Sequence, residues 1–395
     1  MRLIAGRCGR SWNDGVGHDI VGVGPAACGS SLAAEHAVTS RYSRKASTSM
    51  RYEVSGRFTT QRRFVSSIFA IILSALSFGR PSDAAPARST APILHLYVSQ
   101  PSAHEILRFP LNSAGIPAQI PDAVITGLSE PRGLAVGPDH RLFVVDAAAR
   151  RLDIYDPSPG NGAVPSHVLN LPFTTGGLGA VGVDSYGYVY IGYNFGCGEG
   201  SPCANAAVYS PLPSGNEAPF TTYSLGGSPP VAFVTALVIN SEHALAEVVA
   251  EQTRININAP NAPNQTPYAV FCPAIITWGG AWGPEKNELY LTNIGSRNSP
   301  PGPSQVYVLP NYRNGNVNNC PTSYPITSAT VPLDDPFGIA AAGNLIYASS
   351  VYNKQLKSAL LFVFDSNKAG AQTPLAIVAG PASKLSDPYA LAIGP

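Results

Sequence analysis

Three acidic residues that each precede a proline are the first candidates for chemistry in this sequence. They are Glu130, Asp335 and Asp387. Carboxylate oxygens are ligands that Ca²⁺ takes in proteins, so three of them converging on one point would form a calcium site. The simpler alternative is that an acidic residue before proline shapes an exposed turn. The choice depends on whether the fold brings these positions together.

A repeated unit determines where these residues lie. The stretch PRGLAVGPDHRLFVVD, which begins at Pro131, has further copies from Gly177, Trp278 and Asp335, a weaker copy from Val234, and a truncated copy, DPYALAIGP, at the end of the chain. Each complete copy is a run of small and apolar residues, a polar turn, and a run typical of a β-strand. The equivalent positions are predicted to be Gly133, Gly179, Thr235, Gly280, Gly338 and Ala390. The sequence therefore contains six units of about 50 residues.

Each unit is predicted to fold into four antiparallel strands, because further strand-length runs such as RLDIYD and LLFVFD follow. Four-stranded units repeated radially form an all-β fold, here a six-bladed β-propeller. The last unit stops after one strand, and three runs near Ile93, His104 and Ala123 supply the missing strands. The propeller is thus predicted to span residues 93–395 and to be closed by a blade that both chain ends share.

Large side chains lie directly before or near the repeat positions. They are Arg132, Trp278, Phe337 and Tyr389. As ligand-binding residues, the three aromatic side chains would stack on a ligand, and Arg132 would hold a carboxylate or another anion. The alternative is that the aromatic rings only fill the space between neighbouring blades. Sugars and peptides are both compatible with the binding hypothesis.

The stretch PRGLAVGPDHRLFVVDAAARRLDIYD resembles an NHL repeat, and the chain from Ile93 onward resembles a six-bladed propeller of the NHL or SMP-30/gluconolactonase-like type. The resemblance implies that the start of each first strand and the end of each second strand lie on one face. That face would carry the three acidic residues and Arg132, together with Asp146 and Asn293 as further ligand-binding residues. We expect the functional site on this face.

SMP-30-like enzymes share a metal site built from a Glu before a first strand, an Asn in a PNG-like phrase and an Asp in a DG-like phrase. Glu130 is similar to the first of these. The PNG position holds PRG, PFG and PYA in this chain, and no DG-like phrase occurs where a blade begins. The resemblance therefore matches one metal ligand of three, which favours a binding module over a lactonase.

The N-terminal part of the chain differs in charge from the rest. Residues 1–84 contain 11 Lys and Arg against 5 Asp and Glu, whereas residues 85–395 contain 14 against 19. The mildly acidic body excludes a nucleic-acid-binding protein. Three arginines, Arg57, Arg62 and Arg63, precede the apolar run Phe64 to Gly79, which is the order of a secretory signal, with an uncleaved anchor as the alternative. Residues 50–85 are therefore predicted to be a signal segment and residues 1–49 an extension outside the fold.

Four cysteines follow this segment, and an even number in an exported chain favours two disulfides. They are Cys197, Cys203, Cys272 and Cys320. Four cysteines allow three pairings, and we favour the first with the second and the third with the fourth. A zinc site is the alternative, but the CxxC spacing typical of such sites is absent.

These observations predict a secreted or periplasmic propeller that acts as a binding or scaffolding module and is a monomer. The expected partner is a small molecule, a glycan or a protein, bound by the face described above. A metal-dependent lactonase or hydrolase, with Ca²⁺ as its cofactor, is the alternative. A structural envelope protein without a ligand is a third possibility.

Overall fold

The structure is a computed structural model of the chain. The chain divides into two units, Met1–Asp83 and Ala84–Pro395, and every described residue belongs to the second. The four cysteines and the predicted signal segment lie outside the described residues. The described residues are 93–173, 178–194, 204–224, 234–239, 245–249, 254–258, 268–271, 277–283, 287–294, 304–310 and 324–395.

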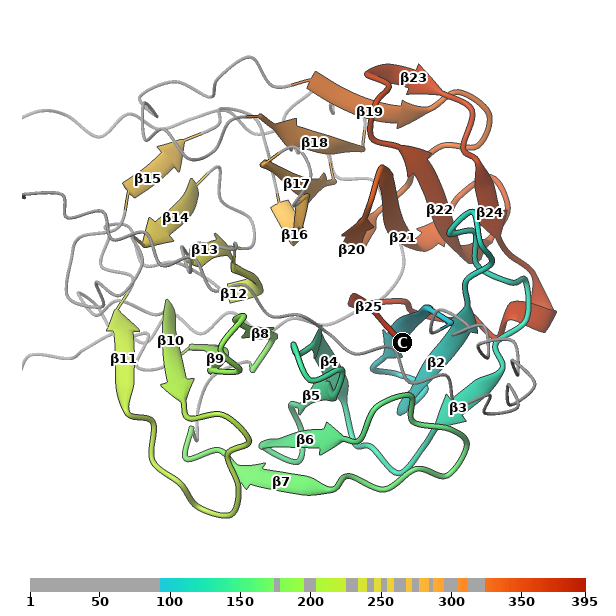
Figure 1. Ribbon diagram of the computed structural model, residues 1–395. Coiled ribbons are helices and arrows are strands. Elements are labelled where there is room, and N and C mark those ends of the chain that lie inside the picture. The colour runs from blue at the N-terminus through green and yellow to red at the C-terminus, as the bar shows by residue number, and fades with distance from the viewer. Residues whose placement is uncertain are drawn as a thin grey trace, which may run out of the picture. The chain divides into compact units, whose positions relative to one another are not determined.

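The described strands form six sheets, arranged around a common centre (Figure 1). The first sheet contains, in spatial order, β25 (Leu391–Gly394), β1 (His95–Gln100), β2 (Glu105–Pro110) and β3 (Ala123–Ile125). The second contains β4 (Pro131–Val136), β5 (Leu142–Asp146), β6 (Arg151–Tyr155) and β7 (His167–Asn170). The third contains β8 (Ala180–Val183), β9 (Val189–Asn194), β10 (Ala204–Tyr209) and β11 (Thr221–Ser224).

The remaining sheets follow in chain order. The fourth contains β12 (Val234–Ile239), β13 (Leu245–Val249), β14 (Arg254–Asn258) and β15 (Tyr268–Phe271). The fifth contains β16 (Thr277–Gly283), β17 (Glu288–Asn293), β18 (Gln305–Leu309), β19 (Tyr324–Ser328) and β23 (Gly370–Gln372). The sixth contains β20 (Pro336–Ala342), β21 (Leu345–Asn353), β22 (Ser358–Asp365) and β24 (Ala376–Val378). A single turn of 3-10 helix, η2 (Pro381–Ser383), precedes β25.

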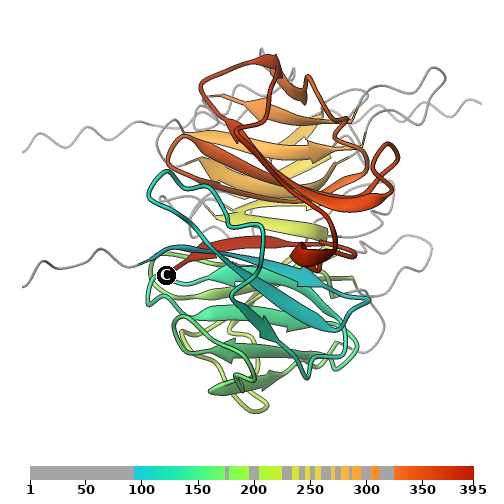
Figure 2. The same cartoon turned by 90° about the vertical axis from the view of Figure 1, so that its right-hand side faces the viewer.

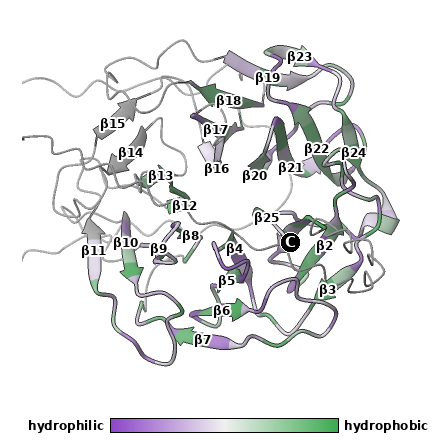
Figure 3. Ribbon diagram, viewed as in Figure 1, coloured by the Kyte–Doolittle hydropathy of each residue, from purple (hydrophilic) through white to green (hydrophobic). Residues whose placement is uncertain are grey.

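The prediction of an all-β propeller with antiparallel four-stranded blades is confirmed. One blade differs from this pattern, because β23 from the following blade adds a fifth strand that runs parallel to β19. Strands β18 and β22, each the third strand of its sheet, are apolar along most of their length, as Figure 3 shows. Strands β1 and β17 are buried at every position, since neighbouring blades cover both faces of each sheet. The described residues contain no helix with the length and apolar character that crossing a bilayer requires.

The start of each first strand lies beside the end of the second, as the resemblance implied. Pro131 pairs with Asp146, and Thr277 pairs with Asn293. In both blades the register shifts directly after this pair. Gly280 is the next residue of β16 that has a partner in β17, as Leu134 is in β4, so Gly280 is the counterpart of Leu134 and not of Gly133. The predicted equivalence of Gly280 with Gly133 is therefore wrong by one residue. The equivalent glycine is Gly279, which makes Trp278 the counterpart of Arg132.

Glycines of the first strands lie where the backbone of the next blade approaches most closely. A Cβ added to Gly133 would lie 2.9 Å from the Val181 nitrogen, and one added to Gly179 would lie 2.7 Å from the Val234 oxygen. At Gly338 the distance to the Tyr389 oxygen would be 2.8 Å. At Gly279 the added atom would overlap the oxygen of Phe337. The repeated glycines are thus required for the blades to meet at the propeller axis.

The two ends of the propeller sequence lie in one sheet. Strand β25 pairs antiparallel with β1, from His95 opposite Gly394 to Val98 opposite Leu391. Figure 2 shows these two strands side by side. The Tyr97 hydroxyl also donates to the Pro395 oxygen at 3.1 Å.

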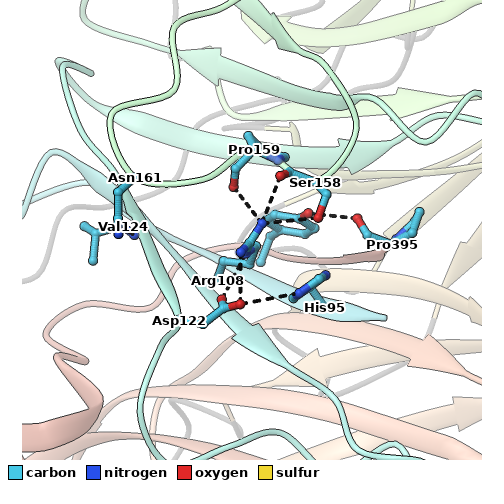
Figure 4. A network of polar contacts seen from close by, with 9 residues as sticks. His95, Arg108, Asp122, Val124, Ser158, Pro159, Asn161 and Pro395 are labelled. Carbon is cyan, nitrogen blue, oxygen red and sulfur yellow. Dashed lines mark hydrogen bonds and ion pairs between the residues drawn. The ribbon is translucent and has the colours of Figure 1, made fainter. Parts of the chain in front are cut away.

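A polar network surrounds this junction (Figure 4). Arg108 in β2 donates to both oxygens of Asp122 at 2.9 Å. Its third nitrogen donates to the backbone oxygens of Ser158 at 2.9 Å and Pro159 at 3.1 Å, in the next blade. His95 Nε2 lies 3.5 Å from Asp122. The arginine therefore connects two strands of the first blade to a loop of the second.

His95 makes the stability of this junction sensitive to pH. Burial, with a contribution from the Arg108 charge, lowers the pKa of His95, although Asp122 acts in the opposite direction. Because the unfolded chain then binds a proton more readily than the folded chain, we expect the free energy of unfolding to fall as the pH decreases through about 6.5. Urea unfolding between pH 8 and pH 5.5 measures this. His95→Gln is expected to flatten the dependence, whereas the exposed control His140→Gln should keep it; equal slopes in both variants would contradict the assignment.

Candidate functional site

A pocket of about 350 Å³ lies at the mouth of the central channel. Every first strand, or a residue one or two positions before it, contributes to its wall. Deeper in the channel the space narrows to about 60 Å³, because the close-packed first strands line it. The pocket at the mouth is therefore the part of the channel with room for a ligand. Its lining residues are Arg132, Gly179, Val234, Thr235, Trp278, Phe337 and Tyr389.

Three aromatic rings form a row along one side of this pocket. The ring centres of Trp278 and Phe337 are 4.6 Å apart, and the rings are stacked with an angle of 27° between their planes. The rings of Phe337 and Tyr389 are 5.4 Å apart and tilted by 46°. The three side chains come from three successive blades, and each is only partly buried. All three line the pocket, and their role in ligand binding stays a prediction.

The indole nitrogen of Trp278 is a buried donor. No acceptor lies within hydrogen-bonding distance of it among the described residues. A buried N–H without a partner costs free energy, so this nitrogen is a local weak point of the fold.

Arg132 forms an ion pair with Glu130, the acidic residue two positions before it. Its Nη2 lies 2.6 Å from Glu130 Oε1, and its Nε donates to the same oxygen at 3.0 Å. Burial raises the pKa of Tyr389, and the Arg132 charge partly offsets this, so the tyrosine keeps its hydroxyl proton at neutral pH. The polar groups at this side of the pocket are thus a paired cation and a neutral hydroxyl.

Asp146 lies behind this ion pair and not in the pocket. Its side chain is fully buried, and its carboxylate accepts from the backbone nitrogens of Ser129 at 2.8 Å and Glu130 at 2.9 Å. It therefore fixes the loop that carries Glu130 and Arg132. Asn293 occupies the equivalent end of β17 and is only 2% exposed. Asp146 thus supports a loop of the site, and neither Asp146 nor Asn293 lines the pocket.

The structure does not bring Glu130, Asp335 and Asp387 together. Among the described residues, no three His, Cys, Asp or Glu side chains are close enough to hold one metal ion. The predicted convergence of these carboxylates is therefore wrong. The physical reason is that nearby groups satisfy two of them: Glu130 accepts from Arg132, and Asp387 accepts from the Ser102 nitrogen at 2.6 Å. The simpler alternative, that these residues shape turns, agrees with these local contacts.

Three buried hydroxyl groups that the sequence analysis did not identify hold the pocket together. Thr292 Oγ1 accepts from the Gly279 nitrogen at 2.7 Å and donates to the Phe337 oxygen of the next blade at 2.7 Å. Ser349 bridges Gly338 and Pro388 in the same way, and Ser99 bridges Ala390 and Arg132. The nitrogens of Gly279 and Gly338 lie where the register shifts, and that of Ala390 lies directly before β25, so each hydroxyl satisfies a nitrogen outside the sheet ladder. The signal in the sequence was a Ser or Thr at one position of the second strand in three units.

Comparison with known proteins identifies the fold. No family model matches the chain, and none of the curated proteins matches it. A chain in the crystal structure of a nidogen/laminin complex is 12% identical, with a TM-score of 0.54 over 76% of this chain and 98% of that chain. A protein of unknown function from Bacteroides caccae is 9% identical, with a TM-score of 0.53 over 77% of this chain and 99% of that one. A streptogramin B lyase structure is 12% identical, with a TM-score of 0.46 over 75% and 83%.

These similarities, at such low identity, establish the class of protein only: the chain is a β-propeller. A fold does not determine a function, so the function has to come from the site itself. The resemblance to NHL or SMP-30-like propellers in particular remains a prediction.

Proposed function

We propose that this protein is a binding module that holds a ring-shaped group of its ligand in the pocket at the channel mouth. The observation that carries the proposal is the row of Trp278, Phe337 and Tyr389 along a pocket of about 350 Å³. Pockets for small ligands have roughly 300–1,000 Å³ and combine apolar walls with a few polar groups, which is the composition found here. The ring would lie against the aromatic row, with its polar substituents toward Arg132.

The charge of the site limits the choice of ligand. Because Glu130 neutralises Arg132, the pocket presents little net charge, and a neutral ring suits it better than a strongly charged one. A sugar ring and the side chain of an aromatic residue both satisfy this requirement.

We also propose that the six sheets are the blades of one closed ring and that the pairing of β25 with β1 holds the ring closed. This is supported by the contacts between the first strands of neighbouring sheets, including those of β25 with β4 and β20. Export, with disulfides between the four cysteines, is a further proposal that rests on the order of arginines and apolar residues from Arg57 to Gly79. We propose that the exported protein is a monomer.

The binding proposal is tested by saturation-transfer NMR with a panel of methyl glycosides and N-acetylated aromatic amino acid amides. We expect at least one probe to bind saturably, and Trp278→Leu to weaken its affinity about tenfold because the stacking surface is lost. The control is Tyr186→Leu, at a tyrosine that is 70% exposed and does not line the pocket. The proposal is wrong if no member of the panel binds, or if Trp278→Leu binds as the control does.

A further inference from the structure

A second pocket, of about 440 Å³, lies between the turn that joins β21 to β22 and the segment that leads from η2 to β25. It shares no lining residue with the pocket at the channel mouth. The residues that line it include an aromatic side chain, two lysines and two serines. Its lining residues are Tyr352, Lys357, Ser358, Ala359, Gly380, Pro381, Lys384, Leu385 and Ser386.

The two lysines have no acidic partner. Within the described part of the chain, the ion pair that involves a lysine joins Lys368 to Asp365 at 3.4 Å, and neither of these residues lines the pocket. Lys357 and Lys384 are both exposed and line the same pocket. Asp387, the nearest acidic residue in the sequence, accepts from Ser102 and Ser386 and does not line the pocket. The pocket therefore presents two positive charges that no acidic side chain of the described residues pairs with.

Buried amide side chains hold both lysine-bearing turns in place. Gln100 is fully buried; its amide nitrogen donates to the Lys384 oxygen at 3.1 Å, and its oxygen accepts from the Ser386 nitrogen at 2.6 Å. Asn353 is also fully buried, donates to the Pro332 oxygen at 2.7 Å and accepts from the Leu356 nitrogen at 2.8 Å. One turn is thus held at Lys384 itself and at Ser386, and the other is held at Leu356, directly before Lys357. A fixed frame reduces the entropy that a ligand must remove when it binds.

The backbone at both lysines is in the left-handed region, which glycine and asparagine favour. The φ angle is 52° at Lys357 and 57° at Lys384. In this region a lysine costs more free energy than glycine would. Arg150 has the same conformation, with φ of 52°, in the equivalent turn of the second blade, and Lys384 is the C-cap of η2, so the local turn geometry sets both angles. In each turn this conformation fixes the direction in which the lysine side chain leaves the backbone.

The aromatic residue and the shape of the pocket select the class of anion. Tyr352 is 49% exposed and lines the pocket together with the two lysines. Extended peptides often bind as an added strand on a free sheet edge, but this pocket is formed by two turns and the paired start of β22. A ring that stacks on tyrosine while its acid group reaches a lysine is a better match.

We propose that this pocket binds an anionic sugar, with the Tyr352 ring against the sugar and Lys357 and Lys384 on its acid group. The carboxylate of a uronic acid and the sulfate of a sugar sulfate have the required chemistry in common. The proposal is independent of the ligand at the channel mouth.

The test is a calorimetric or NMR titration of the full chain with glucuronate and with glucose 6-sulfate, at low and at high salt. We expect saturable binding that weakens as salt increases, and no saturation with glucose. Lys357→Gln and Lys384→Gln are each expected to weaken binding about tenfold, because each removes one charged hydrogen bond. Lys368→Gln is the matched control for a lysine elsewhere, and Lys357→Arg should retain most of the affinity.

The same experiment separates the competing explanations. Binding by glucuronate alone identifies the carboxylate as the preferred acid group, and binding by glucose 6-sulfate alone identifies the sulfate; either result supports the proposal. Triglutamate that binds as tightly as the charged sugars, with the same dependence on the two lysines, would replace the sugar by an acidic peptide. The proposal is overturned if neither charged sugar saturates the protein, or if the two Gln variants bind as Lys368→Gln does. The thermal midpoint of each variant checks that its fold is intact.

Discussion

Replacing Gly279 by alanine is expected to destabilise the protein by about 3 kcal/mol. The added methyl group would overlap the Phe337 oxygen and would come within 3.0 Å of Thr292 Oγ1, so the fifth and sixth blades would have to move apart. The same oxygen accepts the Thr292 hydroxyl, and the Phe337 ring belongs to the aromatic row. Urea unfolding measures the loss, and probe binding at the channel mouth should weaken with it.

Gly160→Ala is the matched control, because nothing lies within 4 Å of an added Cβ at that position. It is expected to change the free energy of unfolding by no more than about 0.5 kcal/mol. If Gly279→Ala is as stable as this control, the close approach of the blades at the axis is not a requirement of the fold.

Removing β25, by deletion of Leu391–Pro395, is expected to abolish cooperative folding. The deletion takes away the inner strand of the first blade and leaves one edge of β1 without a partner. Two apolar side chains that are buried in the core, Leu391 and Ala392, are lost with it. The combined cost is on the order of 5 kcal/mol or more, similar to the total stability of many domains.

A milder substitution keeps this prediction measurable. Leu391→Ala is expected to cost about 3 kcal/mol, whereas Leu375→Ala, at a leucine that is 48% exposed, should cost little. A melting curve of the deletion variant that coincides with that of the full chain would show that the ring does not depend on β25 for its closure.

The sequence was sufficient for the fold because each unit repeats the same two signals, a run of small residues and then a β-rich run. The copy WGGAWG shows the limit of this reasoning. It contains two adjacent glycines, and only the register shift in β16 shows that Gly279, not Gly280, is equivalent to Gly133. Strand β23 could not be predicted, since its three residues carry no periodicity and join a neighbouring sheet through backbone pairing alone.

The candidate site was predictable where it depends on large side chains and unpredictable where it depends on local contacts. Trp278, Phe337 and Tyr389 stand near equivalent positions of successive units, so the sequence already places them around the axis. The acidic residues occupy equivalent positions as well, yet Glu130 and Asp387 each turn to a neighbour within hydrogen-bonding distance. Equivalence in a repeat fixes where a backbone lies, but the direction of a flexible carboxylate follows the donors beside it.

The binding site proposed at the channel mouth is tested most sharply by a crystal structure of the protein with the best-binding probe of the neutral-ring panel. We expect the ring of the probe to lie against Trp278 and Phe337, with a polar substituent toward Arg132. A probe found on another face, or bound with the pocket at the channel mouth still empty, would contradict this expectation.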